Sequence, residues 1–300
     1  MKHLIVDILK IVAPISVALI VFAQGLAIAP NRVVTYFRQQ PWLMLRSLVA
    51  ALVLVPVAAL ALILLLKPGH GVAIGLAILV ACPPAPLMLK MAPNMGGASA
   101  PFMASLHLSL AALALVSVPL ILFLLSIPLG FDADVNAGAM AWVLGRTILI
   151  PISVGLLCRA FFPTFADRAS SIIVKVGNAG LLIVVLIALA ALYPTLLKMD
   201  LWSYVVIVAV SVTALTIGHV LGRGHPSERV TLAVECGVRH PALALTIASA
   251  NFTPQMALPV LVPCIIAFIV VALLYLIWQG RAVAAGKAAH PDTARNPDTL

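Results

Sequence analysis

Three ionisable residues and a proline stand close together in one apolar stretch of this chain. Residues 229–251 are apolar enough to cross a bilayer, yet they contain Glu235, Arg239 and His240, and Pro241 follows at once. A charged side chain at the centre of a membrane helix costs about 3 kcal/mol on insertion scales. Proline removes a backbone donor and kinks or breaks the helix. Charge and broken backbone at membrane depth are tolerated only around a polar cavity, so we predict a ligand site here.

The composition requires that membrane helices position this site. Of 300 residues, 63% are hydrophobic and 9% are charged, and the mean hydropathy is +1.19, whereas soluble domains are about 25% charged. The net charge of +9 comes from basic residues scattered among the ends of apolar segments, which excludes a nucleic-acid partner. The cysteines form no C-x-x-C pair, so we expect structural thiols and neither a metal site nor a disulfide framework. They are Cys82, Cys158, Cys236 and Cys264. No cofactor is predicted.

Windows of about 20 apolar residues predict an all-α polytopic membrane protein with nine transmembrane helices. The predicted spans are 8–29, 42–66, 71–92, 99–126, 138–160, 170–193, 201–221, 229–251 and 256–279. We interpret the first as a retained helix and not as a signal peptide, because its apolar run is long and Arg32 and Arg38 follow it. Residues 1–280 form the predicted transporter domain, and the polar segment 281–300 is predicted to be a disordered cytoplasmic tail.

Basic residues predict the orientation. The positive-inside rule places the amino terminus outside and the carboxyl terminus in the cytoplasm of a bacterial inner (plasma) membrane. Arg146 and Lys175 lie toward span ends and are interpreted as anchors. The basic side carries Arg32, Arg38, Arg46, Lys90, Arg159, Arg168, Arg223, Arg229, Arg281, Lys287 and Arg295. The other side carries Lys2, Lys10, Lys67 and Lys198, with the acidic Asp132 and Asp134.

An odd number of spans permits an inverted repeat in which spans 1–4 match spans 6–9. The third span, 71–92, then corresponds to the eighth, 229–251. The third span also carries prolines in its middle, at Pro83, Pro84 and Pro86. Two interrupted spans at corresponding positions indicate the midplane site of a transporter. Ordinary proline kinks are the alternative, but the charges at Lys90 and Glu235 favour a crossover of two broken helices that forms a site.

The same residues carry a family resemblance. Glu235-Cys-Gly-Val-Arg-His240, continuing PALALTIASANF, resembles the bile acid:sodium symporter family, whose pattern here is Glu-x-Gly-x-Gln-Asn. Gly25-Leu26, the run RQQPWLMLRSLVAALVLVPVAALAL, the run GLAILVACP and Pro119-Leu120 also match. The resemblance covers roughly residues 8–279. It implies a core domain of crossed, broken helices beside a panel domain, and transport by alternating access.

The chain departs from this family where the sodium ions bind. Arg239-His240 stands in place of Gln-Asn, and Pro-Pro-Ala-Pro followed by Met88-Leu89 and Lys90 stands in place of Pro-Gly-Gly and Ser-Asn. The resemblance places Ser105 and Ser109, one turn apart, near the hydroxyl ligands of sodium in the family. Sodium is therefore a doubtful ligand of this chain.

The charged residues admit two interpretations each. Glu235 and Arg239 are spaced i,i+4 and can face each other, so the guanidinium can take the volume and charge of a sodium ion, or the pair can be structural. Lys90 is either a site residue or a cation that extends to the membrane interface. His240 is either a proton relay or a cap on broken-helix backbone. His107 and His219 are interpreted as packing residues.

We predict a secondary transporter that moves a small or amphipathic organic anion by alternating access, independently of sodium. Its substrate and ion-binding residues are Glu235, Arg239, His240 and Lys90. A sodium-coupled, bile-acid-like symporter is the first alternative. An intramembrane enzyme is disfavoured because the spans lack H-E-x-x-H, G-x-S-x-G and paired carboxylates. A membrane sensor is disfavoured because the tail is too short for a signalling domain. The organic anion and the lipid bilayer are the expected partners, and the chain is expected to be a monomer or weak homodimer.

Overall fold

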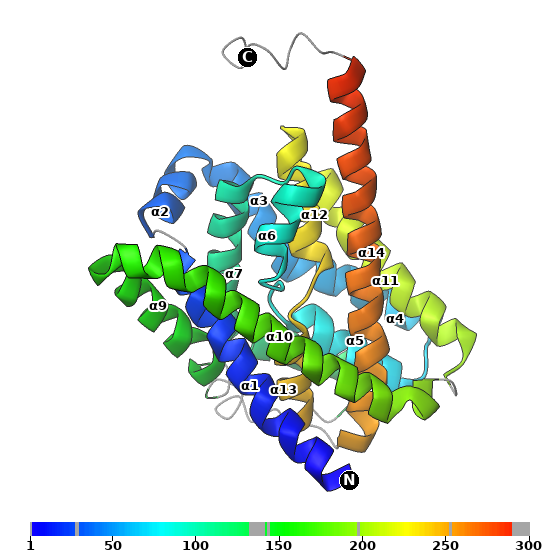
Figure 1. Ribbon diagram of the computed structural model, residues 1–300. Coiled ribbons are helices and arrows are strands. Elements are labelled where there is room, and N and C mark those ends of the chain that lie inside the picture. Colours follow the sequence, from blue (N-terminus) through cyan, green and yellow to red (C-terminus); the bar gives the residue numbers. More distant parts are fainter. Residues whose placement is uncertain are drawn as a thin grey trace.

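The computed structural model describes residues 2–27, 30–131, 142, 145–196, 199–251 and 254–289. These residues form helices joined by short connections (Figure 1). Four helical stretches in the described ranges are long and apolar enough to cross a membrane. They are Pro41–Leu66, Ala100–Leu129, Leu201–Leu221 and Val260–Ala285. The helical fold class agrees with the prediction, whereas the number of nine spans and the inverted repeat stay predictions.

Three helices near the amino terminus and the middle of the chain pack together, and we call them the outer group. They are α1 (Lys2–Ala27), α9 (Ile150–Phe161) and α10 (Pro163–Leu196). Gly25 of α1 and Gly155 of α9 let the two backbones touch: a Cβ on Gly155 would lie 2.9 Å from the Gly25 Cα. The end of α1 is capped from α9, because Arg159 Nη1 donates to the Leu26 carbonyl at 2.6 Å. Helix α2 (Pro30–Gln39) leads out of this group and packs against α7.

The second span is one continuous rod with a π-helical turn inside it. It consists of α3 (Pro41–Val49), η1 (Ala50–Leu54) and α4 (Val55–Leu66). The π turn directly precedes Pro56, whose ring would clash with the carbonyl four residues earlier in a regular α-helix. The same arrangement recurs where η2 (Gly145–Leu149) precedes Pro151 at the start of α9.

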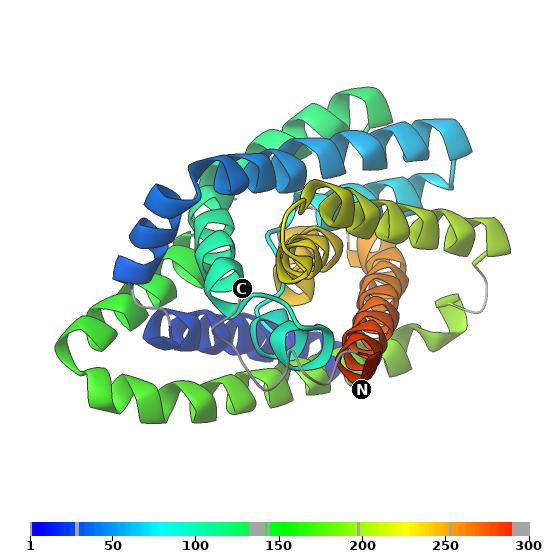
Figure 2. The same cartoon turned by 90° about the horizontal axis from the view of Figure 1, so that it is seen from above.

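Both predicted helix breaks are present. Helix α5 (His70–Ala81) stops at Cys82, and α6 (Met88–Gly96) begins after the prolines. Helix α12 (Pro226–Gly237) stops at Val238, and α13 (Pro241–Asn251) begins after two more residues. Helix α5 is buried on all sides from Val72 to Ala81, which fits a helix that is apolar all round. Seen from above, α12 and α13 lie near the centre of the molecule (Figure 2).

The remaining helices surround this centre. They are α7 (Ala100–Leu129), α11 (Leu201–Leu221) and α14 (Pro254–Ala289). The structure corrects the predicted start of the tail: α14 continues through 281–289, because the sequence RAVAAGKAA is rich in strong helix formers. The rest of the predicted tail, 290–300, lies outside the described residues. At its start α11 is capped by Asp200, and the Ser203 hydrogen bonds hold the pKa of that carboxyl below its ordinary value.

Candidate functional site

The two broken helices cross through their extended segments. Pro84 and Arg239 form an isolated antiparallel bridge. The His240 amide donates to the Pro83 carbonyl at 2.9 Å, and the Ala85 amide donates to the Val238 carbonyl at 3.2 Å. Backbone groups at membrane depth have no water to bond with, so each extended segment satisfies the other. The crossover predicted at Pro83, Pro84, Pro86 and Pro241 is therefore formed by main-chain hydrogen bonds.

Arg239 binds main-chain oxygen atoms on two other elements. Its side chain is buried, Nη1 donates to the Cys82 carbonyl at 3.1 Å, and Nη2 donates to the Ala51 carbonyl at 3.3 Å. Cys82 ends α5, and Ala51 lies in η1. One guanidinium thus joins the crossover to the second span, which its planar fork of donors makes possible.

A proline in one case and a helix end in the other leave these two carbonyls without a donor in the helical register. In η1 the Val55 amide bonds to the Ala50 carbonyl, five residues earlier, so the next donor in that register would be residue 56, which is a proline. For Cys82, the helix has already ended: α5 stops at Ala81 and Cys82 is extended, so no amide follows in the helical register. Proline has no N–H, and a buried carbonyl without a donor is costly. Arg239 supplies a donor to each of the two carbonyls.

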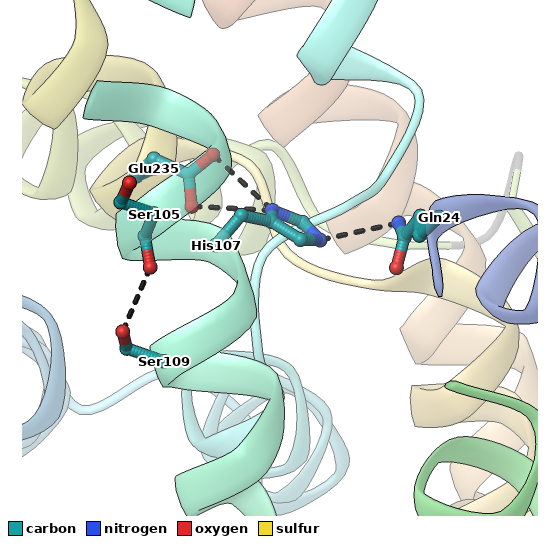
Figure 3. A network of polar contacts seen from close by, with 5 residues as sticks. All are labelled: Gln24, Ser105, His107, Ser109 and Glu235. Atoms are coloured by element: carbon teal, nitrogen blue, oxygen red, sulfur yellow. Dashed lines mark hydrogen bonds and ion pairs between the residues drawn. The ribbon is translucent and has the colours of Figure 1, made fainter. Parts of the chain in front are cut away.

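Glu235 meets a histidine from another helix. The carboxylate is fully buried, and both of its oxygens face His107 of α7: Nδ1 lies 3.2 Å from Oε1 and 3.3 Å from Oε2. On the other side of the ring, Nε2 of His107 lies 3.2 Å from Nε2 of Gln24 on α1. Because the Gln24 amide nitrogen is a donor, His107 accepts at Nε2 and donates its Nδ1–H to the carboxylate. Figure 3 shows His107 between Glu235 and Gln24.

The predicted contact between Glu235 and Arg239 is wrong. Within the described ranges the ion pairs are His107–Glu235 and Arg159–Asp167. The i,i+4 argument requires a continuous helix, but α12 ends at Gly237 and Val238 is extended. Arg239 therefore leaves the helix axis and reaches Cys82 and Ala51.

His240 caps a helix. Its Nδ1 accepts from the Leu243 amide at 3.3 Å, which satisfies one free donor at the start of α13. The ring proton is then on Nε2. This atom is buried and has no hydrogen-bond partner in the described part of the chain, and the same is true of Nε of Arg239. Successive side chains of an extended segment point to opposite faces. Arg239 reaches η1 on its side of the segment.

The other predicted residues have simpler surroundings. The Ser105 hydroxyl donates to the Pro101 carbonyl at 2.9 Å, and the Ser109 hydroxyl donates to the Ser105 carbonyl at 2.7 Å, both within α7. Lys90 belongs to α6, and its side chain lies outside the described part of the structure. His219 bonds to the Tyr275 hydroxyl at 2.7 Å, as expected for a packing residue. No cluster of three or more His, Cys, Asp or Glu side chains in the described ranges could hold a metal ion.

Sequence reasoning missed Gln24 and the role of His107, which it interpreted as a packing residue. One signal could have found them: a carboxylate buried in a membrane helix requires a donor, and His107 and Gln24 are polar residues in the apolar spans 99–126 and 8–29. Their partners lie 128 and 83 residues away along the chain, so only the fold brings them together.

Comparison with known proteins decides the family. Residues 14–199 match the model of the Sodium Bile acid symporter family. The chain belongs to this family. The matched segment includes the first broken helix, η1 and most of the outer group, whereas Glu235, Arg239 and His240 lie beyond it.

Two relatives extend the family match toward the carboxyl terminus. The chain is 27% identical over 258 residues to a probable sodium/metabolite cotransporter, BASS2, from Oryza sativa subsp. japonica. The alignment covers 82% of this chain and 59% of that chloroplastic protein. It is 23% identical over 252 residues to an uncharacterized sodium-dependent transporter, YocS, of Bacillus subtilis (strain 168), covering 82% of this chain and 76% of that protein. The chain thus shares its family with proteins that are named as transporters.

Proposed function

We propose that this chain is a secondary transporter that moves a small or amphipathic organic anion by alternating access. The family match supports the transport class. The crossover supports the mechanism, because two helices broken at membrane depth provide a fixed site between parts that can move. We take α5, α6, α12 and α13 as the core side and the outer group as the panel side.

The polarity of the crossover favours an anion. The amino-terminal ends of α6 and α13 begin there, and helix amino termini carry a partial positive charge. His240 adds an unpartnered, buried Nε2–H donor. Arg239 contributes its charge, while both terminal nitrogens bind backbone. Lys90 stays a proposed site residue, as do Ser105 and Ser109 with less support.

Sodium independence rests on one observation, the position of the Arg239 guanidinium. In transporters with broken helices, unwound carbonyls and the carboxyl ends of half-helices coordinate the sodium ion. In this chain the carbonyl at the end of α5 and the carbonyl in η1 accept from Arg239 instead. A cation bound to those oxygens would have to displace the guanidinium. The residues present therefore do not fit a sodium ion at this position.

The environment of the transporter follows from the same proposal. The chain lies in a bacterial inner membrane with its amino terminus outside and its carboxyl terminus in the cytoplasm, as a monomer or weak homodimer. The start of α1 and the end of α14 lie at opposite ends of the molecule (Figure 1), which is consistent with this orientation.

Uptake by purified protein in liposomes tests the proposal. Radiolabelled cholate serves as the amphipathic probe and radiolabelled succinate as the small one, each measured with an inward sodium gradient and with an equal choline gradient. We expect protein-dependent uptake of at least one probe, equal within about twofold in the two gradients. Uptake of either probe that rises steeply only with sodium would contradict sodium independence.

A sodium-coupled symporter is the second candidate, and the printed names of both relatives favour it. The rice protein is named a sodium/metabolite cotransporter, and the Bacillus protein is named a sodium-dependent transporter. In this candidate, sodium binds to oxygens other than those of Ala51 and Cys82. The two gradients of the uptake assay separate the two candidates.

A further inference from the structure

The surroundings of Glu235 contain a second departure from sodium coupling, separate from the Arg239 contacts. The carboxylate is fully buried and lies in the last turn of α12. A helix carboxyl terminus is itself negative, so this position is unfavourable for an acid without a partner. A buried carboxylate in a low-dielectric environment must receive hydrogen bonds or a cation.

His107 occupies the place of that cation. Its Nδ1 lies almost equally far from both carboxylate oxygens, at 3.2 Å from Oε1 and 3.3 Å from Oε2. This position between the two oxygens is the one that a bidentate cation would take. The imidazole is 2% exposed, so it cannot turn away into solvent.

The group that contacts the carboxylate is of the wrong kind for an alkali cation. Sodium is a hard cation and takes oxygen ligands, whereas His107 presents an N–H. The next group, Gln24, presents its amide nitrogen to His107. Glu235 thus faces the His107 N–H donor, where a sodium site would supply further oxygen acceptors.

The geometry points to His107 as the residue that closes the Glu235 carboxylate to sodium, and thus as a determinant of ion selectivity in this transporter. Gln24 is its positioning residue, because the amide holds the far side of the imidazole from α1. This inference deepens the proposed function and rests on it. It assigns to His107 a role separate from that of Arg239, which occupies the carbonyls of Ala51 and Cys82.

The test replaces the imidazole with a small oxygen-bearing side chain. His107→Ser removes the N–H donor and adds a hydroxyl oxygen in a helix that already contains serines at 105 and 109. The melting temperature of purified protein in detergent is measured in 200 mM sodium chloride and in 200 mM choline chloride. We expect the melting temperature of the wild type to differ by less than about 1 °C between the two salts. The melting temperature of His107→Ser should be about 2–5 °C higher in sodium chloride than in choline chloride. Adding Glu235→Gln should abolish that gain.

His219→Ser is the matched control, because His219 is also a histidine in an apolar helix that bonds one side chain, Tyr275. It should show no gain specific to sodium. If His107→Ser does not fold, His107→Asn is measured instead, since its amide also supplies an oxygen. A folded variant that melts equally in both salts overturns the inference, as does a wild type with the same sodium gain.

These results are separable from those of the uptake assay. If the wild type takes up a probe without sodium and the melting temperature of His107→Ser is the same in both salts, only the role of His107 is overturned. A sodium gain that appears on His107→Ser and disappears with Glu235→Gln supports the inference even if neither cholate nor succinate is transported.

Discussion

Arg239 illustrates how a buried charge in a membrane protein can be satisfied without an acid. Its two terminal nitrogens donate to the carbonyls of Cys82 and Ala51. Pro56 removes the donor in the register of Ala51, and Cys82 lies beyond the end of α5. A hydrogen bond to a charged group contributes about 1.5–3 kcal/mol. The guanidinium is therefore a structural bridge between the crossover and the second span, whatever its effect on ions.

Arg239→Gln should destabilise the protein and make it respond to sodium. The amide cannot bridge both carbonyls, so we expect a loss of about 1.5–3 kcal/mol in the free energy of unfolding, measured by thermal or denaturant unfolding in detergent. Sodium chloride should restore part of the loss, and choline chloride should not, because the released carbonyl oxygens are sodium ligands of the kind that broken helices supply.

Arg46→Gln is the control for this substitution. Arg46 also donates to a backbone carbonyl, that of Arg223, at 2.8 Å, through an exposed hydrogen bond from a half-buried side chain. We expect a change within about 0.5 kcal/mol and no specific effect of sodium. An Arg239→Gln protein as stable as the wild type would show that the guanidinium is not needed. If the variant is destabilised but responds equally to both salts, the guanidinium is a structural bridge and does not take the place of an ion.

At the residue scale the sequence predicted which residues are unusual, but not which residues they contact. Glu235, Arg239 and His240 stand out because charge in an apolar span is costly. The expected Glu235–Arg239 pair failed because Gly237 ends the helix between them. His107 and Gln24 come from distant spans, and nothing in local spacing joins them to Glu235.

Helix breaks were more predictable than contacts. Proline acts on its own turn of backbone, so Pro83, Pro84 and Pro241 predict where the helices stop without any knowledge of the fold. The π-helical turns before Pro56 and Pro151 have the same local cause, although they were not predicted. The end of α14 was placed too early, because the segment 281–289 is less apolar than a membrane span yet has high helix propensity.

The contact between α1 and α9 should be intolerant of even one methyl group. A Cβ on Gly155 would overlap the Phe22 carbonyl and lie 2.9 Å from the Gly25 Cα. Backbone atoms cannot move aside as a flexible side chain can, so Gly155→Ala should separate the helices and cost about 1–3 kcal/mol of stability. Unfolding in detergent measures the loss.

Gly145→Ala provides the comparison for this element, because a Cβ there meets nothing within 4 Å. We expect its melting temperature to equal or slightly exceed that of the wild type, since alanine restricts the unfolded chain more than glycine does. Equal stability of the Gly155→Ala and Gly145→Ala proteins would contradict the close approach of α1 and α9.

At the scale of the whole molecule, the polar network joins the two parts that alternating access would separate. Gln24 belongs to the outer group, His107 to α7 and Glu235 to the crossover (Figure 3). A change in the position of α1 relative to the crossover must therefore act on the Gln24–His107 hydrogen bond. In the proposed mechanism, conformation and ion selectivity would be linked through this one imidazole.

The orientation of the molecule in the membrane gives the largest-scale prediction. Trp202 Nε1 at the start of α11 donates to the Leu66 carbonyl at the end of α4 at 2.7 Å, so the 67–70 connection and the start of α11 lie on one side. The far end of α11 leads to Arg223. The excess of basic residues predicts that Arg223 faces the cytoplasm and His70 the outside.

Cysteine labelling in spheroplasts measures this orientation. His70→Cys and Arg223→Cys, both at exposed positions, are made in a Cys158→Ser background, because Cys158 is half-buried while Cys82, Cys236 and Cys264 are buried. A membrane-impermeant maleimide should modify position 70 in intact spheroplasts and position 223 only after permeabilisation. The background protein should stay unlabelled in both. Labelling in the reverse pattern would show that the protein has the opposite orientation, because the two ends lie on opposite sides of the membrane. The positive-inside argument for this chain would then be wrong.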